Sequence, residues 1–322
     1  MIDNNCLFLG IDTSNYTTSI ALINEDRQVI YEARRMLTVK SGETGLQQSA
    51  AFFQHIKNIP DLFADSAVEL TERLSAIAVS ATPRPVEDSY MPVFQAGVSI
   101  AELLAQLYKV PIYYTSHQEG HIAAGLYSIA VKPCTNRFFA VHLSGGTTEI
   151  LSVEQRGATY ATDIVGGTLD LHAGQLLDRI GVALGLGFPA GAELEQLAQH
   201  ADLPIPSLAV NVIGGSFNLS GAESQAKRLH VSGVTPATLA RAAEEAVACS
   251  VAEALGNVID ACGEREILFV GGVAQNRYIR RVIAERLKQY GVKLYFADGK
   301  YSGDNAYGVA NIALDNYLLN IE

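Results

Sequence analysis

The chain has 322 residues, of which 48% are hydrophobic and 18% are charged, and its formal net charge is −11. This length is enough for two hydrophobic cores, and no apolar run approaches the ~18 residues that cross a membrane. The acidic balance excludes a protein that binds nucleic acid unaided, because phosphates are held by clustered Lys and Arg. The four cysteines lack metal or disulfide spacing and the first residues lack a signal-peptide pattern, so we expect reduced thiols, no membrane association and a cytoplasmic location.

Basic residues form only small clusters, which we interpret as solvated helix and strand ends. The clusters are Arg34–Arg35–Lys40, Lys227–Arg228 and Arg277–Arg280–Arg281. An RNA substrate would therefore need a basic partner protein to help dock it.

The first half of the chain alternates apolar strand patterns with amphipathic helix patterns. These patterns predict strands at 7–12, 17–23, 28–37, 75–81 and 111–115, and helices at 46–65, 93–109 and 117–129. A Pro-containing stretch at 131–136 is the natural linker to the second half.

The second half repeats this order of elements. It predicts strands at 138–144, 148–154, 159–165, 266–271 and 293–297, and helices at 171–184, 190–201, 235–262, 277–290 and 305–319. The repeat predicts an α/β fold of two duplicated domains, each with a mixed sheet flanked by helices. We expect one domain at 1–133, with a C-terminal helix at about 305–322 packing back on it, and the other at 134–304, with an insertion at about 204–230.

Each half opens on the same motif: an apolar strand, a turn rich in Gly, Ser and Thr, and a second apolar strand. The two copies are LFLGIDTSNYTTSIALI at 7–23 and FAVHLSGGTTEILSVE at 139–154. Such turns expose backbone N–H groups and short hydroxyls, which hold phosphate oxygens, and a repeat at domain scale strengthens this interpretation. The sequence therefore predicts a nucleotide in a cleft between the domains, with Thr13 and Ser14 in the first turn and residues 143–147 in the second.

A pair of histidines, His117 and His121, follows the predicted strand PIYYTS. At a spacing of four residues both stand on one face of a helix and can bind one metal ion, and the end of a strand is where α/β sites usually lie. Asp304, at the start of the last predicted helix, could supply a third ligand if that helix returns to the first domain. The spacing differs from the HExxH motif of zinc proteases, so we reject a peptidase.

Two further blocks carry polar residues beside glycines. In Gly166–Gly191, Asp170 and Asp178 lie on the first turns of a helix and could hold ribose hydroxyls or a magnesium ion. In LFVGGVAQNRYIRR, Asn276 follows a buried strand and a Gly-Gly turn and could reach a base or ribose.

Together these motifs resemble, in order and over nearly the whole chain, the transferase family of tRNA threonylcarbamoyladenosine synthesis, TsaD in bacteria, formerly labelled O-sialoglycoprotein endopeptidase. The segments that carry the resemblance are GIDTSNYTTSIAL, SHQEGHIAAGL, LSGGTTEIL, TLDLHAGQLLDRIGVALGLGFPAG, SFNLSGAESQAKR, GGVAQN and GDNAYGVA.

The resemblance implies an actin/Hsp70/sugar-kinase-like fold and metal-dependent transfer of a threonylcarbamoyl group from an adenylate to an adenosine amine on tRNA. It matches the metal ligands with His117, His121 and Asp304, which suit a divalent ion such as iron or zinc. It also implies ATP, ADP or an acyl-adenylate, with Mg as a further ion. Its nucleotide- or substrate-binding positions correspond to Leu143, Ser144, Gly145, Gly146, Thr147, Asp178, Gly191 and Asn276.

Four segments depart from the family pattern, at 14–18, 82–89, 144–147 and 170–179, and two of them bear on the substrate. The first turn, residues 14–18, lacks two acidic groups, and the loop at 82–89 replaces a Gly-rich one, so we interpret the chain as a divergent paralogue. Two alternatives stay open: an ATP-dependent kinase or carbamoyltransferase of a small metabolite, and a non-catalytic nucleotide-binding partner subunit. We expect a homodimer, or a heterodimer with a smaller paralogue, and assign no side chain as a general base.

Overall fold

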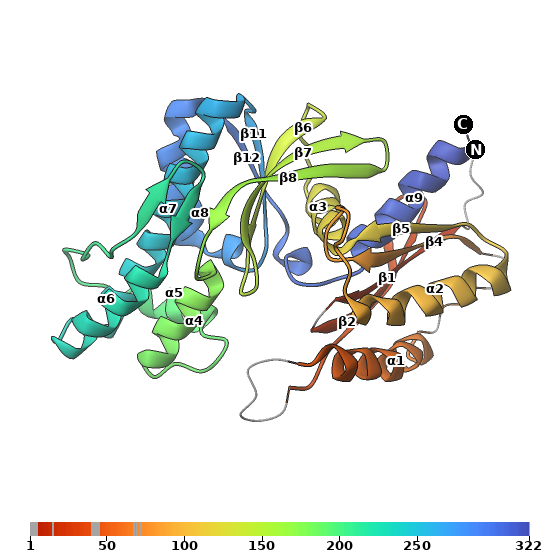
Figure 1. The fold of residues 1–322 in the computed structure, drawn as a ribbon, viewed down its shortest axis with the longest axis horizontal. Helices are drawn as coiled ribbons and strands as arrows, with labels where there is room; N and C mark the ends of the chain where they lie inside the picture. Colours follow the sequence, from red (N-terminus) through yellow and green to blue (C-terminus); the bar gives the residue numbers. More distant parts are fainter. Residues whose placement is uncertain are drawn as a thin grey trace. The chain divides into compact units, whose positions relative to one another are not determined.

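The computed structural model describes residues 6–14, 16–39, 46–66, 68, 70 and 73–321, and Lys40 of the first basic cluster lies outside them. The chain divides into two compact units (Figure 1). Unit 1 consists of Met1–Lys132, Gln155–Ala161 and Gly303–Glu322, and unit 2 of Pro133–Glu154 and Thr162–Ser302. The expected second domain, 134–304, included Gln155–Ala161 and Asp304. In the structure both belong to unit 1.

Unit 1 contains a five-stranded mixed sheet in the order β3-β2-β1-β4-β5. Its strands β1 to β3 are antiparallel, whereas β1, β4 and β5 are parallel to one another. The apolar side chains of β1 are buried on both faces, as expected for a central strand covered by helices. The strand bounds are Leu7–Ser14 (β1), Thr17–Asn24 (β2), Val29–Met36 (β3), Leu74–Thr82 (β4) and Ile112–Ser116 (β5).

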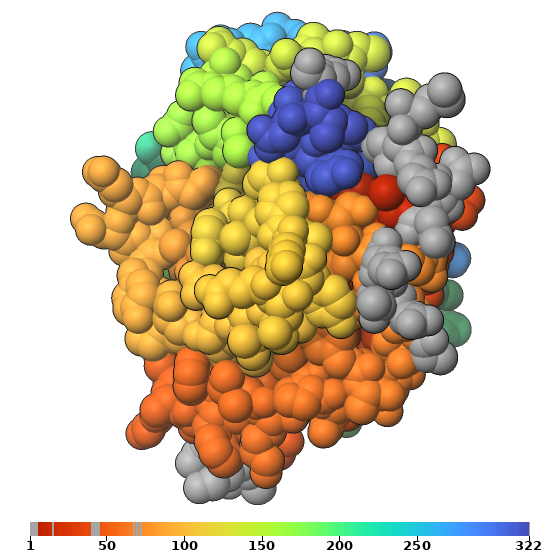
Figure 2. All heavy atoms as spheres, turned by 90° about the vertical axis from the view of Figure 1, so that its right-hand side faces the viewer, coloured from red at the N-terminus to blue at the C-terminus, as the bar shows by residue number. Residues whose placement is uncertain are grey.

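Helices cover this sheet, and the last helix of the chain is one of them. They are α1 (Gln48–Ala64), α2 (Gln95–Tyr108), α3 (His117–Ser128) and α9 (Tyr307–Ile321). In the space-filling view of Figure 2 the blue α9 lies among red to gold segments of the amino-terminal half. The approach is close because Gly10 has no side chain: a Cβ there would lie 2.4 Å from the Ala306 carbonyl oxygen.

Unit 2 contains a seven-stranded mixed sheet in the order β12-β11-β6-β7-β8-β10-β9. The 27-residue helix α7 has a long buried face, which packs with the central strands into one core. The strands are β6 (Arg137–Leu143), β7 (Thr148–Arg156), β8 (Thr159–Thr168), β9 (Asn211–Ile213), β10 (Ser216–Asn218), β11 (Glu266–Val270) and β12 (Lys293–Phe296). The helices are α4 (Ala173–Ala183), α5 (Gly191–Ala198), α6 (Ser220–Val231), α7 (Pro236–Cys262) and α8 (Arg277–Leu287).

The expected mixed sheets and flanking helices are confirmed. The expected insertion contains regular structure, since β9 and β10 extend the sheet and α6 packs on α4 and α7. In the part of the chain that the structure describes, no helix combines the length and apolarity needed to cross a membrane.

Candidate functional site

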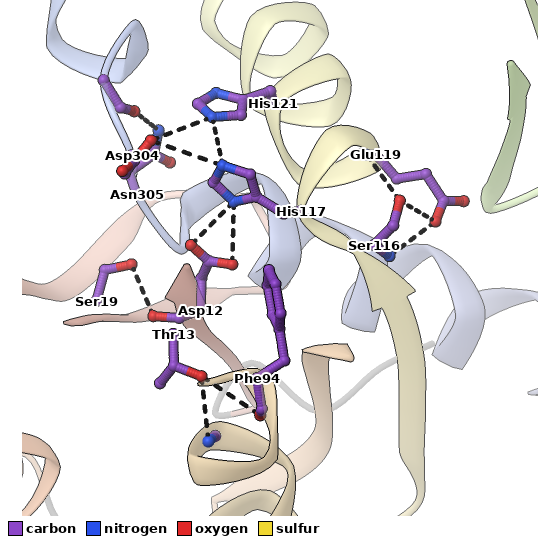
Figure 3. A network of polar contacts seen from close by, with 12 residues as sticks. Asp12, Thr13, Ser19, Phe94, Ser116, His117, Glu119, His121, Asp304 and Asn305 are labelled. Atoms are coloured by element: carbon purple, nitrogen blue, oxygen red, sulfur yellow. Dashed lines mark hydrogen bonds and ion pairs between the residues drawn. The ribbon is translucent and has the colours of Figure 1, made fainter. Parts of the chain in front are cut away.

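The first turn of α3 is fixed by a capping box. The Ser116 hydroxyl accepts a hydrogen bond from the Glu119 N–H at 3.2 Å, and the Glu119 carboxylate accepts one from the Ser116 N–H at 2.8 Å. Glu119 also accepts hydrogen bonds from the Thr115 hydroxyl and the Tyr160 N–H. The helix therefore begins at His117, and Figure 3 shows His117 and His121 on one face of it, with Glu119 directed away from them.

The two histidines and Asp304 converge on one point in unit 1. The His117 and His121 Nε2 atoms are 3.1 Å apart, and the Asp304 carboxylate lies 3.6 Å from the first and 3.4 Å from the second. One ligand atom from each residue lies within 4.8 Å of the others. Two imidazoles and a carboxylate in this arrangement fit a divalent transition metal or zinc.

The loop that carries Asp304 is held by its neighbour Asn305. The Asn305 side chain donates a hydrogen bond to the Gly303 carbonyl at 2.7 Å and accepts one from the Tyr307 N–H at 3.0 Å. Asp304 is thus fixed immediately before α9, and α9 packs on α3. The return of the last helix is what brings Asp304 to the histidine pair.

The sequence analysis missed Asp12, a fully buried carboxylate in the middle of β1. Its two oxygens lie 3.2 and 3.1 Å from Nδ1 of His117, on the side of the ring opposite Nε2, the nitrogen that faces His121 and Asp304 (Figure 3). Carboxylates in this position orient a ligand histidine and fix which nitrogen carries the proton. The available signal was a single acidic residue inside an apolar strand, since a buried charge is kept only when it is paired.

Asp12 and Asp304 also set the electrostatics of His117. Burial by itself lowers the pKa of His117, but the charge and hydrogen bond of Asp12, together with the charge of Asp304, raise this pKa to about 9. Burial likewise raises the pKa of Asp12, and the His117 contact brings it below its ordinary value. The two carboxylates therefore favour a positive charge at this position in unit 1.

Thr13 of the first hairpin faces into unit 1. Its buried hydroxyl accepts a hydrogen bond from the Gly97 N–H at 3.2 Å and thereby ties β1 to the start of α2. The neighbouring Ser14 Oγ is buried and has no hydrogen-bond partner within the described residues. This orphaned hydroxyl is compatible with a polar ligand at Ser14, whereas Thr13 acts by holding the backbone of the turn.

His55 of α1 contacts this hairpin through Thr18, and the sequence analysis did not identify it. It is fully buried, and its Nδ1 lies 2.8 Å from the Thr18 hydroxyl, which also accepts a hydrogen bond from Asn58. Burial lowers the pKa of His55 to about 4, so the ring is neutral at physiological pH.

The second hairpin presents backbone groups in unit 2. The Ser144 hydroxyl accepts hydrogen bonds from the Gly146 and Thr147 N–H groups at 3.3 and 3.0 Å and shapes the turn. Apart from the chain neighbours, no atom of the described residues lies within 4 Å of a Cβ built on Gly145 or Gly146, so the turn is open on that side. Leu143 is buried in the core beneath it.

The other predicted binding residues of unit 2 make structural contacts. Asp178 accepts a hydrogen bond from the Ala190 N–H at 2.8 Å and so braces the turn before α5, whose first residue, Gly191, borders open space. Asn276 caps α8 by accepting from the Ile279 N–H at 2.9 Å, and its amide donates to the buried Glu244 carboxylate at 2.6 Å. Both ends of the Asn276 side chain are engaged, and its expected contact with a nucleotide stays a prediction.

A sequence profile of one family, described as TsaD: tRNA N6-adenosine threonylcarbamoyltransferase, matches residues 40–311. The chain belongs to the TsaD family. A Thermus thermophilus protein named tRNA N6-adenosine threonylcarbamoyltransferase is 31% identical over 305 residues, covering 94% of this chain and 90% of that protein. The family resemblance expected from the motifs is thereby confirmed, and with it an acyl-group transferase rather than a peptidase.

Solved structures show how widely this TsaD-family fold is used. Full-length HypF, in a phosphate- and nucleotide-bound form, superposes with a TM-score of 0.59 at 12% identity; the match covers 99% of this chain and 56% of HypF, so the chain spans little more than half of that protein. A glucokinase of the ROK family from Streptomyces griseus superposes with a TM-score of 0.54 at 11% identity, covering 95% of this chain and 99% of the glucokinase. These likenesses confirm the expected actin- and sugar-kinase-like fold.

Proposed function

We propose that the chain transfers a threonylcarbamoyl group from an acyl-adenylate to the exocyclic amine of a tRNA adenosine, with a divalent metal bound by His117, His121 and Asp304. The convergence of these three side chains in a TsaD-family chain is the observation that carries the proposal. A family member that had lost its chemistry would have no reason to hold Asp304 against both histidines, which speaks against a purely non-catalytic partner subunit.

In the proposed reaction the adenosine amine attacks the carbamoyl carbonyl carbon. A nitrogen–carbon bond forms, the bond from that carbon to the AMP oxygen breaks, and the amine loses one proton. When bound, the metal would act as a Lewis acid on a carbonyl or phosphoryl oxygen. Asp12 would fix the orientation of the His117 ring. In the second hairpin the Gly145 N–H would donate to a phosphate oxygen, while the Gly146 and Thr147 N–H groups hold the turn by donating to Ser144. Positioning and charge stabilisation would then provide most of the rate.

The acidic chain would need help to dock tRNA, because its formal net charge is −11. We therefore expect a basic partner protein, and a homodimer or a heterodimer with a smaller paralogue remains part of the proposal. An adenine nucleotide would be the small-molecule ligand.

The test is reconstitution with unmodified tRNA, ATP, threonine, bicarbonate, the adenylate-forming enzyme and candidate partner subunits. Threonylcarbamoyladenosine is read by mass spectrometry for wild type, His117→Ala and His200→Ala, the last being a surface histidine of unit 2. Product from wild type and His200→Ala, but not from His117→Ala, supports the proposal. A folded wild type that binds metal and nucleotide but gives no product with active partners contradicts it and directs the search to small metabolites as acceptors.

A further inference from the structure

Arg34 of β3 lies on the same face of the unit 1 sheet as the metal ligands. In the antiparallel ladders Asp12 is directly opposite Ser19, and Ser19 is directly opposite Arg34. Residues directly opposite one another project to the same face, and Asp12 projects toward His117 (Figure 3). With strands about 4.8 Å apart, the Arg34 backbone lies about 10 Å from that of Asp12, within reach of a long side chain.

The guanidinium reaches the loop that carries Asp304. A Cβ built on Gly303, the residue before Asp304, would lie 3.8 Å from Nη1 of Arg34. Strand register and the proximity of Nη1 to Gly303 therefore place this cation on the same face of the sheet as Asp12, near the residue that precedes Asp304.

Arg34 also has its hydrogen-bonding capacity free. Among the described residues its exposed guanidinium has no ion pair or hydrogen bond, whereas the next residue, Arg35, projects to the other face and pairs with Asp61 at 2.7 Å. A guanidinium with unused donors, next to a metal site, matches the planar geometry of a carboxylate or the oxygens of a phosphate. The interpretation of Arg34 as a solvated strand end does not account for this position.

We propose that Arg34 forms an anion subsite next to the metal centre, which binds an oxyanion of the ligand held there. This inference rests on the proposed function for the ligand, because a threonylcarbamoyl adenylate offers two such groups: the threonine carboxylate and the AMP phosphate. Both lie within a few bonds of the carbonyl that is attacked. Arg34 would orient the donor through a charge-assisted hydrogen bond, while the metal holds its other end.

The subsite is tested by equilibrium binding to the full chain loaded with Mn²⁺, without tRNA or partners. One probe pair is N-carbamoylthreonine and its methyl ester, and the other is AMP and adenosine. The variants are Arg34→Gln, Arg34→Lys and the matched control Arg35→Gln, each checked for unchanged melting temperature and Mn²⁺ content. We expect Arg34→Gln to weaken binding of an anionic probe about tenfold or more, Arg34→Lys to restore part of it, and Arg35→Gln to bind as wild type does.

The pattern identifies the source of the oxyanion. A loss confined to N-carbamoylthreonine, with its ester unaffected, assigns the carboxylate, and a loss confined to AMP, with adenosine unaffected, assigns the phosphate. The subsite is overturned if Arg34→Gln binds each anionic probe as tightly as wild type does. It is also overturned if wild type binds neither anionic probe more tightly than the neutral analogue of that probe. The binding assay contains no tRNA and so does not depend on the acceptor. If Arg34→Gln loses binding of an anionic probe but the reconstitution with tRNA gives no product, only the proposed acceptor is refuted.

Discussion

Gly308 of α9 offers a sharp test of how the metal site is assembled. A Cβ at this position would lie 1.9 Å from the Gly120 carbonyl oxygen and 2.6 Å from the Ala124 nitrogen, both backbone atoms of α3. An ordinary carbon–oxygen contact is about 3.3 Å, so the Cβ added by Gly308→Ala would lie about 1.4 Å too close to the Gly120 carbonyl oxygen. Backbone atoms cannot rotate away, and α9 would have to move from α3.

That movement would separate the metal ligands, because α3 carries both histidines and Asp304 immediately precedes α9. Metal–ligand distances tolerate only about 0.2 Å. We therefore expect Gly308→Ala to weaken metal binding at least tenfold. Overpacking should also lower the free energy of unfolding by about 1–3 kcal/mol, even though alanine favours a helix over glycine by about 1 kcal/mol.

The assay is competition for Zn²⁺ with a chromophoric chelator, with urea unfolding of the same samples. Gly120→Ala is the matched control: it lies on the facing helix between the two histidines, and its Cβ would meet only the Val309 Cγ2 at 3.1 Å, a methyl group that can shift slightly. We expect this variant to stay close to wild type in both measurements. Wild-type affinity and stability in Gly308→Ala would refute the claim that close contact between the α3 and α9 backbones maintains the site.

Three further predictions concern buried carboxylates. Asp12→Asn should weaken metal binding about 10–100-fold, as loss of a carboxylate behind a ligand histidine typically does, and wild-type affinity in the chelator assay would contradict the orienting role. Burial raises the pKa of Glu266, but hydrogen bonds from Cys134, Tyr295 and other groups lower it to about 2. The stability from Glu266 is therefore present above the unfolded pKa of about 4.5 and lost as pH falls toward 2, so Glu266→Gln should be destabilised by about 1–3 kcal/mol at pH 7 and much less at pH 3 in urea unfolding. Burial raises the pKa of Glu244 to about 7, which makes its contribution less favourable as pH rises from about 4.5 through 7. Glu244→Gln should thus gain stability relative to wild type between pH 5 and 8, and a constant difference across this range would show that Glu244 does not titrate there.

The grouping of His117, His121 and Asp304 could be predicted from short motifs, and their role as metal ligands stays a prediction. His117 and His121 share a helix face by spacing alone, and Asp304 needed only the inference that the last helix returns to the first domain. Apolar strands around Gly-, Ser- and Thr-rich turns likewise predicted the two hairpins. The spacing of residues along a helix and the residue types in the turns were sufficient to predict these features.

Features that depend on register or on distant partners could not be predicted. No residue near Arg34 in the sequence indicates the register in which β3 pairs with β2, and this register directs the Arg34 side chain to the same face of the sheet as Asp12. Strands β9 and β10 have three residues each and exist because β8 provides an edge for β10. The contact of the Asn276 amide with Glu244 could not be predicted because Glu244 lies on another helix, whereas the cap that Asn276 forms on α8 is local.

The place of Asp304 in the chain has a consequence for biosynthesis. The two histidines are made before all of unit 2, whereas Asp304 and α9 follow it. The nascent unit 1 therefore has only two of the three proposed ligands and lacks the helix that covers Gly10. Domains usually fold in the order of synthesis. Here the unit that is begun first is completed last, and the three proposed metal ligands can come together only after unit 2 has been translated.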